Sequence, residues 1–301
     1  MVPERLKKGD KVAVVAPAGR FKSHDIDPGL LILDDWGLDV QLGKHIFDGD
    51  GFFSASDENR RKDLQEAISS PEIKAIFCAR GGFGLGRIID DLHLLPLLKN
   101  PKWIIGFSDI TLLHFKLHSL GLISIHGPMV KQYGQHVDSS SVQALKDILF
   151  KNDQVVYELP SHPGNRAGDA SGELIGGNLS LITNNLGTNS DVDFRNKVLF
   201  VEEVNEFIYI IDRQLNQLQR ARKLDHLKAL IVGQFTSMKD TDPTYGKSVY
   251  DLITEYTNPY DYPVLFDFPA GHGRQNMPLL ISANCQVKVD SKASVRFLLN
   301  E

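Results

Sequence analysis

Cysteine is scarce in this 301-residue chain, which contains only Cys78 and Cys285. Small secreted domains that depend on disulfides carry many closely spaced cysteines. Two cysteines so far apart exclude a disulfide framework and are typical of a protein kept in a reducing compartment. We therefore expect a cytoplasmic protein that folds around an apolar core without covalent cross-links.

Long apolar runs and an excess of positive charge are also missing. No stretch approaches the roughly 18 apolar residues that a membrane span needs, and Met1–Lys8 lacks the apolar segment of a secretory signal peptide. The chain has 33 Lys and Arg against 38 Asp and Glu, a formal net charge of −5. Proteins that bind nucleic acid usually show a clustered basic face. The sequence therefore predicts neither a membrane nor a nucleic acid as partner.

The remaining composition is that of an ordinary globular protein, and its length suggests two domains. In the first half, short apolar runs rich in β-branched residues alternate with helical runs. Strands are expected at Lys11–Ala16, Ile73–Ala79, Trp103–Phe107 and Leu122–Ile125, and helices at Glu58–Ser69, Ile88–Leu98 and Leu112–Leu120. This alternation predicts an α/β domain whose parallel sheet is covered on both faces.

The pattern changes after about residue 150. Residues 161–177 are rich in Gly, Pro, Ser, Asn and Asp and show no helical period, which is typical of a linker. We predict a first domain over 1–155, a linker over 156–175 and a smaller α+β or barrel-like domain over 176–301. Its strands are expected at Val198–Val204, Leu227–Gly233, Val264–Phe268, Leu279–Ala283, Gln286–Val289 and Ser294–Leu299, and its helices at Ile208–Lys223 and Val249–Tyr256.

Ser108 stands at the boundary between a predicted strand and a predicted helix. Ligands of parallel α/β sheets bind at the carboxyl ends of the strands. A serine at such a turn exposes its hydroxyl, and the backbone N–H of Asp109 can face a developing oxyanion. In the alternative interpretation, Ser108 is the N-cap of the following helix, with Thr111 beside it. The spacing alone favours the cap.

A glycine-rich turn over 80–86 follows the second predicted strand. Its glycines fit neither a P-loop nor the G-x-G-x-x-G pattern, so they give little support for a nucleotide site. A backbone amide of Gly81 or Gly82 is instead a candidate second donor to an oxyanion. The alternative is a turn that merely needs positive φ angles.

Two further motifs carry titratable groups. His272 lies between Gly271 and Gly273 in a loop after a strand, where it is accessible enough to act as a general base. Glu202 and Glu203 end an apolar strand, and a carboxylate there could orient a histidine. Taken singly, each motif is more typical of a surface position: a loop histidine, and a pair of solvated charges.

His114 and His118 are four residues apart on one predicted helix, a spacing that could hold a metal ion. Their apolar neighbours favour a packed helix instead. The sequence predicts no metal site and no cofactor.

In their order along the chain, these motifs resemble the LD-carboxypeptidase family of serine peptidases, which includes muramoyltetrapeptide carboxypeptidases. The resemblance covers essentially the whole chain. It rests on the strings GDKVAVVAPAG at 9–19, ARGGFG at 79–84, GFSDIT at 106–111, HGPM at 126–129, GGNLS at 176–180, LFVEEV at 199–204, IDRQLNQL at 211–218 and GHG at 271–273.

The resemblance implies a catalytic triad. The serine of the Gly-aromatic-Ser-Asp string is the family's nucleophile, which is Ser108 here. The histidine of Gly-His-Gly is its base, which is His272. Its acidic member is the first carboxylate after the aliphatic strand, Glu202. Glu203 stays open as the alternative, because neighbouring residues of a strand point to opposite faces.

The resemblance also implies an oxyanion hole and a fold. The amide of Asp109 and that of Gly81 or Gly82 would bind the oxyanion, and Arg80 is a candidate for binding the substrate's terminal carboxylate. The family fold combines an N-terminal Rossmann-like domain with a C-terminal β-rich, barrel-like domain, with the site between them. Its members are often homodimers.

The activity implied is a serine carboxypeptidase that releases the terminal D-Ala of murein tetrapeptide in peptidoglycan recycling. Relatives that resemble the microcin C immunity peptidase cleave peptidyl- or acyl-nucleotide analogues with the same triad and remain an alternative. A non-catalytic peptide-binding protein on the same scaffold is the alternative from another class. A Ser108→Ala variant separates an enzyme from such a binding protein.

Overall fold

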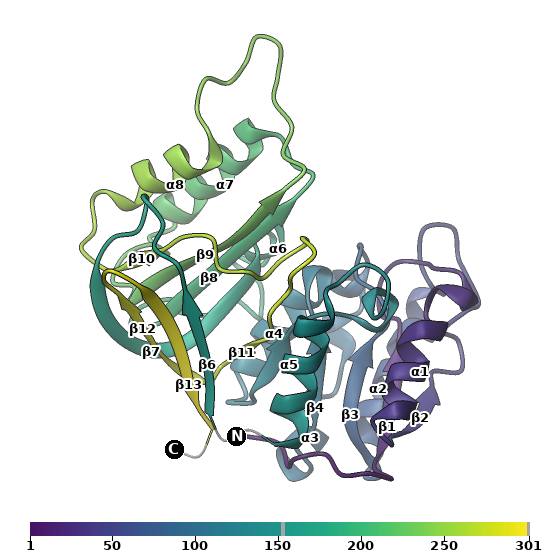
Figure 1. The fold of residues 1–301 in the computed structure, drawn as a ribbon. Coiled ribbons are helices and arrows are strands. Elements are labelled where there is room, and N and C mark those ends of the chain that lie inside the picture. Colours follow the sequence, from purple (N-terminus) through teal and green to yellow (C-terminus); the bar gives the residue numbers. More distant parts are fainter. Residues whose placement is uncertain (152–153, 300–301) are drawn as a thin grey trace. The chain divides into compact units, whose positions relative to one another are not determined.

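A computed structural model describes residues 1–151 and 154–299 of the chain. These form two compact units (Figure 1). Unit 1 comprises Met1–Asn152 and Arg274–Ile281, and unit 2 comprises Asp153–Gly273 and Ser282–Glu301. Of the predicted domains, 1–155 and 176–301 each include two residues, 152–153 and 300–301, that lie outside the described ranges.

Unit 1 is built around a six-stranded sheet in the order β11-β5-β4-β3-β1-β2. All neighbouring strands are parallel except β11, which runs antiparallel to β5. The strands are β1 (Lys11–Val15), β2 (Asp39–Leu42), β3 (Ile73–Cys78), β4 (Trp103–Gly106), β5 (Ser124–His126) and β11 (Leu279–Ile281).

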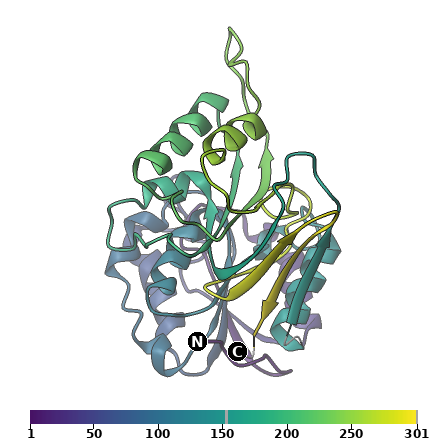
Figure 2. The ribbon, with the colours of Figure 1, turned by 90° about the vertical axis from the view of Figure 1, so that its left-hand side faces the viewer.

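The helices of unit 1 cover both faces of this sheet, and α1 and α5 lie side by side (Figures 1 and 2). The α-helices are α1 (Asp27–Asp35), α2 (Asp57–Ser69), α3 (Pro96–Lys99), α4 (Thr111–His118) and α5 (Ser139–Phe150). The short 3-10 helices are η1 (Ser23–Asp25), η2 (Leu85–Arg87), η3 (Ile89–Asp91), η4 (Ser108–Ile110) and η5 (Val130–Gln132).

The strand order explains where unit 1 can hold a ligand. Strands β1, β3 and β4 are buried almost throughout, as expected of a parallel sheet covered on both faces. The order 2-1-3-4-5 is doubly wound, and its direction reverses between β1 and β3. Ligands of such sheets bind outside the carboxyl ends of the strands near this reversal. The predicted Rossmann-like parallel sheet is thus confirmed.

Unit 2 contains a seven-stranded sheet in the order β10-β9-β8-β7-β12-β13-β6. Strands β10 to β7 pair in parallel, and β7 to β6 pair antiparallel. The strands are β6 (Gln154–Leu159), β7 (Gly168–Asn178), β8 (Val198–Val204), β9 (Ala229–Thr236), β10 (Val264–Leu265), β12 (Asn284–Val289) and β13 (Ala293–Leu298), and the helices are α6 (Leu179–Asn184), α7 (Ile208–Arg220) and α8 (Val249–Thr257).

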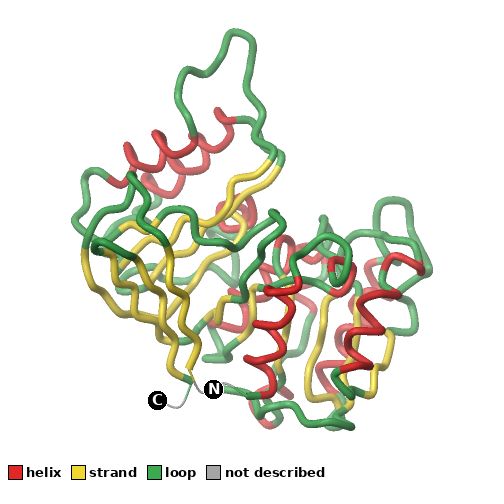
Figure 3. The backbone as a smooth tube through the Cα atoms, viewed as in Figure 1, coloured by secondary structure: helices red, strands yellow, loops and turns green. Residues whose placement is uncertain are grey.

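The burial of these strands follows their pairing. Strands β8 and β9 are almost continuously buried, whereas β6 and β13 alternate between buried and exposed residues. Such alternation is typical of antiparallel strands with one face in water. The pairings of the described residues run from β10 to β6, so the predicted β-rich domain is a curved mixed sheet with helices on its parallel part (Figure 3).

The predicted linker over 156–175 is wrong. These residues include most of β6 and the first part of β7, which enter the sheet of unit 2. The Gly, Pro and Ser residues at 161–177 that suggested a linker lie partly in the connection between the two strands and partly in β7 itself, which contains Gly168, Ser171, Gly172, Gly176 and Gly177. Alternating exposure also hides the apolar content of these strands, because every second side chain faces water.

The last segment of the predicted second domain is also divided differently. Leu279–Ile281, expected as a strand of that domain, is β11 and pairs with β5 of unit 1.

A second correction concerns the helix predicted over Ile88–Leu98. The chain there forms η3, an extended residue at Leu92 and the four-residue α3, which begins at Pro96. The break lies at Leu92, whose ψ angle of 128° is extended. Proline lacks a backbone N–H and suits the first turn of a helix rather than its interior, so Pro96 starts a new short helix instead of continuing the first.

The two cysteines are free and buried, Cys78 in β3 and Cys285 in β12. Burial raises the pKa of the Cys78 thiol to about 12, so this group stays protonated and behaves as a small apolar side chain. Among the described residues, no helix has both the length and the apolar character to cross a membrane.

We expect Leu64→Ala to lower the free energy of unfolding by about 3 kcal/mol, because Leu64 on α2 is fully buried and its truncation leaves a cavity. Leu31→Ala is the control. Leu31 on α1 is 70% exposed, so its loss should change stability by less than about 0.5 kcal/mol. Equilibrium urea unfolding followed by circular dichroism measures both. Equal losses would contradict the burial of Leu64.

Candidate functional site

Ser108 follows the carboxyl end of β4 and opens η4. Its φ angle is 62°, a left-handed conformation that is uncommon for residues other than glycine. In enzymes with the α/β-hydrolase fold, nucleophilic serines sit on strained turns between a strand and a helix. Helix α4 begins at Thr111, with Ile110 as its N-cap and no capping side-chain bond recorded there. The interpretation of Ser108 as the cap, which spacing favoured, is therefore wrong.

Gly81 packs directly against Ser108. A Cβ atom at Gly81 would lie 3.0 Å from Ser108 Cβ and 3.2 Å from Ser108 Oγ. The Gly81 carbonyl accepts a hydrogen bond of 3.0 Å from the Gly19 amide, which holds this turn against the segment after β1. Gly82 has a φ angle of 112°, so the turn needs a glycine there. The glycine-rich turn thus brings its backbone to the serine without a side chain in between.

Asp109 holds the turn of Ser108 to the glycine-rich segment. Its carboxylate is 1% exposed, and Oδ2 accepts a hydrogen bond of 2.8 Å from the Leu85 amide. Burial raises the pKa of Asp109 to about 6, although this bond and the charge of Arg60 favour the ionised form. This side chain faces the interior, which leaves only the backbone amide of Asp109 as a candidate donor to a substrate.

Arg80 is partly exposed at the start of the same turn. Its Nη1 donates a hydrogen bond to the carbonyl of Arg20. This contact ties the start of the turn to the segment after β1. The guanidinium has five N–H groups in total, so it can also offer donors to a ligand.

His114 is buried on α4 and supports the end of β4. Its Nδ1 is 2.8 Å from Ser124 Oγ and its Nε2 is 2.9 Å from the Gly106 carbonyl. A carbonyl can only accept, so Nε2 carries the proton and Nδ1 accepts from the serine hydroxyl. Burial lowers the pKa of His114 to about 4, which keeps the ring neutral. Both ring nitrogens thus already have hydrogen-bond partners, one of them the Gly106 carbonyl two residues before Ser108, and a metal ion at either nitrogen would break that contact.

The metal alternative gains no support elsewhere. Within residues 1–151 and 154–299, no group of three or more His, Cys, Asp or Glu side chains is arranged to hold a metal ion.

In unit 2, His272 and Glu202 form a hydrogen-bonded pair. His272 Nδ1 lies 2.7 Å from Glu202 Oε2, and the glutamate side chain is 0% exposed. Burial by itself lowers the pKa of His272, but the charge of Glu202 and this hydrogen bond outweigh it, so the pKa is raised above its ordinary value. The carboxylate fixes the ring and favours its protonated form. These are the functions of the acidic member of a catalytic triad.

Glu203 performs a different task. Its Oε1 accepts from Asn178 Nδ2 at 2.7 Å and from the Val204 amide at 2.9 Å, and its Oε2 accepts from the Ser180 amide at 2.8 Å. The latter contact satisfies an amide in the first turn of α6. Both glutamates are buried, so the interpretation as solvated charges is wrong. Of the two, only Glu202 bonds to His272.

A β-bulge explains how the chain brings Glu202 to His272. Strands β8 and β9 lose register there, since Val201 pairs with Val232 but Glu203 pairs with Phe235. The extra residue lies on β9 opposite Glu202, and such bulges redirect side chains near functional sites.

Gln234, next to this bulge, anchors the histidine loop. Its amide donates to the Ala270 carbonyl at 2.9 Å, and its Oε1 accepts from the Gly273 amide at 2.9 Å. A Cβ at Gly273 would lie 2.3 Å from Gln234 Oε1, and one at Gly271 would lie 3.0 Å from Glu202 Oε2. Gly271 also has a φ angle of 134°, which favours glycine, and a side chain at position 273 would have to displace the Gln234 side chain from the Gly273 amide. Sequence reasoning missed Gln234, because nothing in its local pattern distinguishes it from other polar residues at strand ends.

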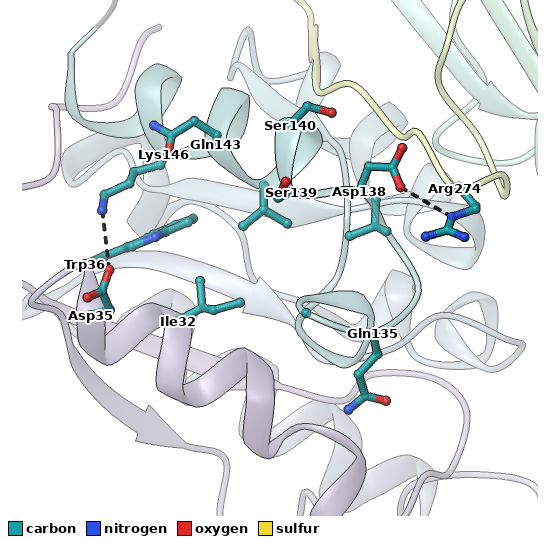
Figure 4. Close-up of a pocket in the computed structure, with 13 residues that line it drawn as sticks. Ile32, Asp35, Trp36, Gln135, Asp138, Ser139, Ser140, Gln143, Lys146 and Arg274 are labelled. Atoms are coloured by element: carbon teal, nitrogen blue, oxygen red, sulfur yellow. Dashed lines mark ion pairs between the residues drawn. The ribbon is translucent and has the colours of Figure 1, made fainter.

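A separate cavity of about 670 Å³ lies in unit 1, between α1 and α5 (Figure 4). Ion pairs flank it, with Lys146 Nζ 3.8 Å from Asp35 Oδ2 and Arg274 Nε 3.4 Å from Asp138 Oδ1. None of its lining residues is among the predicted site residues. The cavity is thus distinct from the residues gathered around Ser108.

Comparisons with known proteins cover both units. Residues 12–127 match the LD-carboxypeptidase N-terminal domain, and residues 171–287 match the LD-carboxypeptidase C-terminal domain. Ser108 lies in the first match, and Glu202 and His272 lie in the second. The chain is 36% identical over 297 residues to a probable murein peptide carboxypeptidase of Bacillus subtilis, which covers 97% of this chain and 93% of the relative.

Solved structures share the fold. The muramoyltetrapeptide carboxypeptidase from Oxalobacter formigenes has a TM-score of 0.87 and 26% identity, covering 95% of this chain and 98% of that one. The microcin C7 self-immunity protein in complex with aspartyl sulfamoyl adenosine has a TM-score of 0.89 and 21% identity, covering 99% and 98%. The second likeness shows the fold alone.

The contact between Glu202 and His272 leads to a prediction about the pKa of His272. Followed by NMR, His272 should titrate above its ordinary pKa, and Glu202→Gln should lower this pKa because it removes the charge that favours the protonated ring. Because the folded-state pKa is raised, the pair contributes stability fully at acidic pH and loses it as the pH rises through that pKa. Glu203→Gln is the matched control and should shift the pKa far less. Equal shifts in the two variants would contradict the assignment.

Proposed function

Because this chain belongs to the LD-carboxypeptidase family of serine peptidases, we propose that it releases the terminal D-Ala of murein tetrapeptide by a Ser108–His272–Glu202 triad. The substrate is either the free peptide or the peptide joined to its muramoyl sugar. The observation that carries this proposal is the bond of 2.7 Å between a buried Glu202 carboxylate and His272. This pair is the orienting half of a serine-hydrolase triad.

In the first chemical step, the Ser108 hydroxyl attacks the carbonyl carbon of the scissile amide. A serine hydroxyl is a weak nucleophile, so a base must take its proton during the attack. In neutral His272, the Nδ1–H donates to Glu202 Oε2, which leaves Nε2 as the basic nitrogen. The proposal requires Nε2 to take the Ser108 proton. Glu202 then stabilises the imidazolium that forms.

The carbonyl oxygen gains negative charge as the tetrahedral intermediate forms. In this proposal the amide of Asp109 and one amide of the glycine-rich turn, at Gly82 or Gly81, donate to it. Loss of one such donor typically raises the barrier by about 3 kcal/mol. The left-handed conformation of Ser108 and the close approach of Gly81 support this arrangement, because a Cβ at Gly81 would lie only 3.2 Å from Ser108 Oγ.

Breakdown of the intermediate completes acylation. The C–N bond breaks while His272 gives its proton to the departing amine of D-Ala, which leaves an ester on Ser108. Water then attacks this ester with His272 as base, and the shortened peptide leaves with a new carboxylate. Every proton moves through one imidazole, and no cofactor takes part in the proposal.

Recognition of the substrate needs a group that binds the terminal carboxylate. We assign Arg80 to this task. Its contact with the Arg20 carbonyl fixes the guanidinium at the start of the glycine-rich turn, and its remaining N–H groups suit a carboxylate. The bond that is cut joins an L-centre to a D-residue, so the pocket has to accept the inverted configuration after the bond.

The setting proposed for this activity is a cytoplasmic homodimer in peptidoglycan recycling. Two free, buried thiols support a reducing compartment, and the homodimer follows from the family resemblance. Light scattering of the purified chain decides the oligomeric state.

An immunity peptidase is the second candidate function. The likeness to the microcin C7 self-immunity protein favours it, although that likeness is one of fold. Its substrates would be acyl-sulfamoyl nucleotides rather than murein peptides. A comparison of the two substrate classes at equal enzyme concentration separates the candidates.

The first prediction concerns the nucleophile. Ser108→Ala should lower the rate of D-Ala release from murein tetrapeptide by at least about 10⁴-fold, because no other group can form the acyl-enzyme. Mass spectrometry measures the loss of one alanine. Ser140→Ala on the exposed start of α5 is the control and should keep full activity. Release by both variants would reject Ser108, and binding without turnover by the unmodified chain would favour the peptide-binding alternative.

The second prediction concerns the glycine-rich turn. Gly81→Ala should lower kcat by about 10²-fold, because its Cβ would press on Ser108 and displace the hydroxyl. Gly86→Ala in the same turn is the matched control, since its Cβ would meet only the tip of the Leu112 side chain. Steady-state kinetics on the tetrapeptide measures both. Similar kcat values in the two variants would remove Gly81 from the site.

A further inference from the structure

We propose that three phenylalanines of unit 1, Phe52, Phe53 and Phe83, form a subsite for the muramoyl sugar of the substrate. This inference rests on the proposed function and goes beyond it, because it assigns a part of the substrate that the triad does not touch. We call these three residues the aromatic row.

The aromatic row exposes an unusual amount of apolar surface. Phe52 is 59% exposed and Phe83 is 55% exposed, and both flank the ring of Phe53. The ring centroids of Phe52 and Phe53 are 5.8 Å apart at an interplanar angle of 86°, and those of Phe53 and Phe83 are 6.0 Å apart at 42°. Isolated apolar residues on a surface are common, but a contiguous aromatic surface indicates a binding site.

The backbone and two arginines hold the row in place. The Phe52 carbonyl accepts from the Arg20 amide at 2.9 Å, and Phe53 exchanges backbone hydrogen bonds with Asp50. The guanidinium groups of Arg60 and Arg87 lie 4.8 and 5.4 Å from the centroid of the Phe53 ring. These contacts order the Phe53 ring, against which the two exposed rings of Phe52 and Phe83 pack.

The row continues from the glycine-rich turn that touches Ser108. A Cβ at Gly82 would lie 3.9 Å from Phe52 Cε1, and Gly81, the residue before it, packs against Ser108 Oγ. These two contact distances, the two Cα–Cβ bonds and the one Cα–Cα step between the glycines add up to about 14 Å. This sum is the upper limit for the distance between the edge of the Phe52 ring and the Ser108 hydroxyl. In an extended tetrapeptide, the three residues between the scissile bond and the sugar span roughly 10 Å. The sugar of a bound substrate can therefore reach the row.

The chemistry of the row selects a sugar over other parts of the substrate. Murein tetrapeptide has no aromatic or large apolar side chain, whereas the pyranose ring presents a face of C–H groups. These carry a partial positive charge and suit the negative face of an aromatic ring. A second copy of the chain is the competing occupant.

The test compares two substrates, the free tetrapeptide and the same peptide carrying N-acetylmuramic acid. The unmodified enzyme should have about tenfold higher kcat/KM for the sugar-bearing peptide, mainly through KM. The double variant Phe52→Ala, Phe83→Ala should lose this preference and keep its kcat/KM for the free peptide within about twofold. Phe47→Ala is the matched control, because Phe47 is 43% exposed but packs on Phe21 outside the row.

Three outcomes would overturn the subsite. These are no preference for the sugar in the unmodified enzyme, an equal loss on both substrates in the double variant, and conversion of a dimer to a monomer by that variant in light scattering. Calorimetric binding of the two peptides to the Ser108→Ala variant, with and without the double change, tests the subsite without turnover. If the unmodified enzyme hydrolyses neither peptide, the proposed function fails, while sugar-dependent binding that is lost with the two rings still supports the subsite.

Discussion

The buried carboxylate of Glu202 is the constraint on which the candidate site depends. A charged group that is fully removed from water must be compensated by a partner, and here the partner is the Nδ1–H group of His272. The surrounding geometry follows from this contact. Strand β9 is bulged opposite Glu202, Gln234 bonds to the histidine loop, and Gly271 before His272 has a φ angle of 134° that favours glycine. The fold thus raises the basicity of a single imidazole.

Ser108, the proposed nucleophile, is held in position by different contacts in unit 1. Ser108 is held in a left-handed conformation at the end of β4, and the hydrogen bonds of nearby side chains stabilise this strained turn. His114 bonds to the Gly106 carbonyl before the serine, and Asp109 bonds to the Leu85 amide after it. Gly81 can then approach the hydroxyl closely. His114 and Oδ2 of Asp109 are buried and bonded to backbone groups nearby, so their expected effect is to fix the backbone rather than to move protons.

Much of this was predictable from the sequence, for reasons that differ between elements. The strands around Ser108 are continuous apolar runs, and their alternation with helices predicted a parallel sheet. The weak motifs at Ser108, Glu202 and His272 became informative only through their shared order along the chain. By contrast, β6 and β7 were mistaken for a linker, since alternating exposure gives short strands a polar composition. Leu279–Ile281 was assigned to the wrong sheet, because the sequence of a strand does not show which other strand it pairs with.

The sequence by itself determined the class of fold, the family and the residue types that a serine-hydrolase mechanism needs. These depend only on local residue patterns and on the order of the motifs along the chain, both of which can be read from the sequence. Only the tertiary structure distinguished Glu202 from Glu203, since the two are chemically identical neighbours and differ only in which groups their carboxylates meet. It also decided that Ser108 is not a helix cap, and it revealed Gln234 and the aromatic row. Each of these depends on contacts between residues far apart in the chain, which no local pattern encodes.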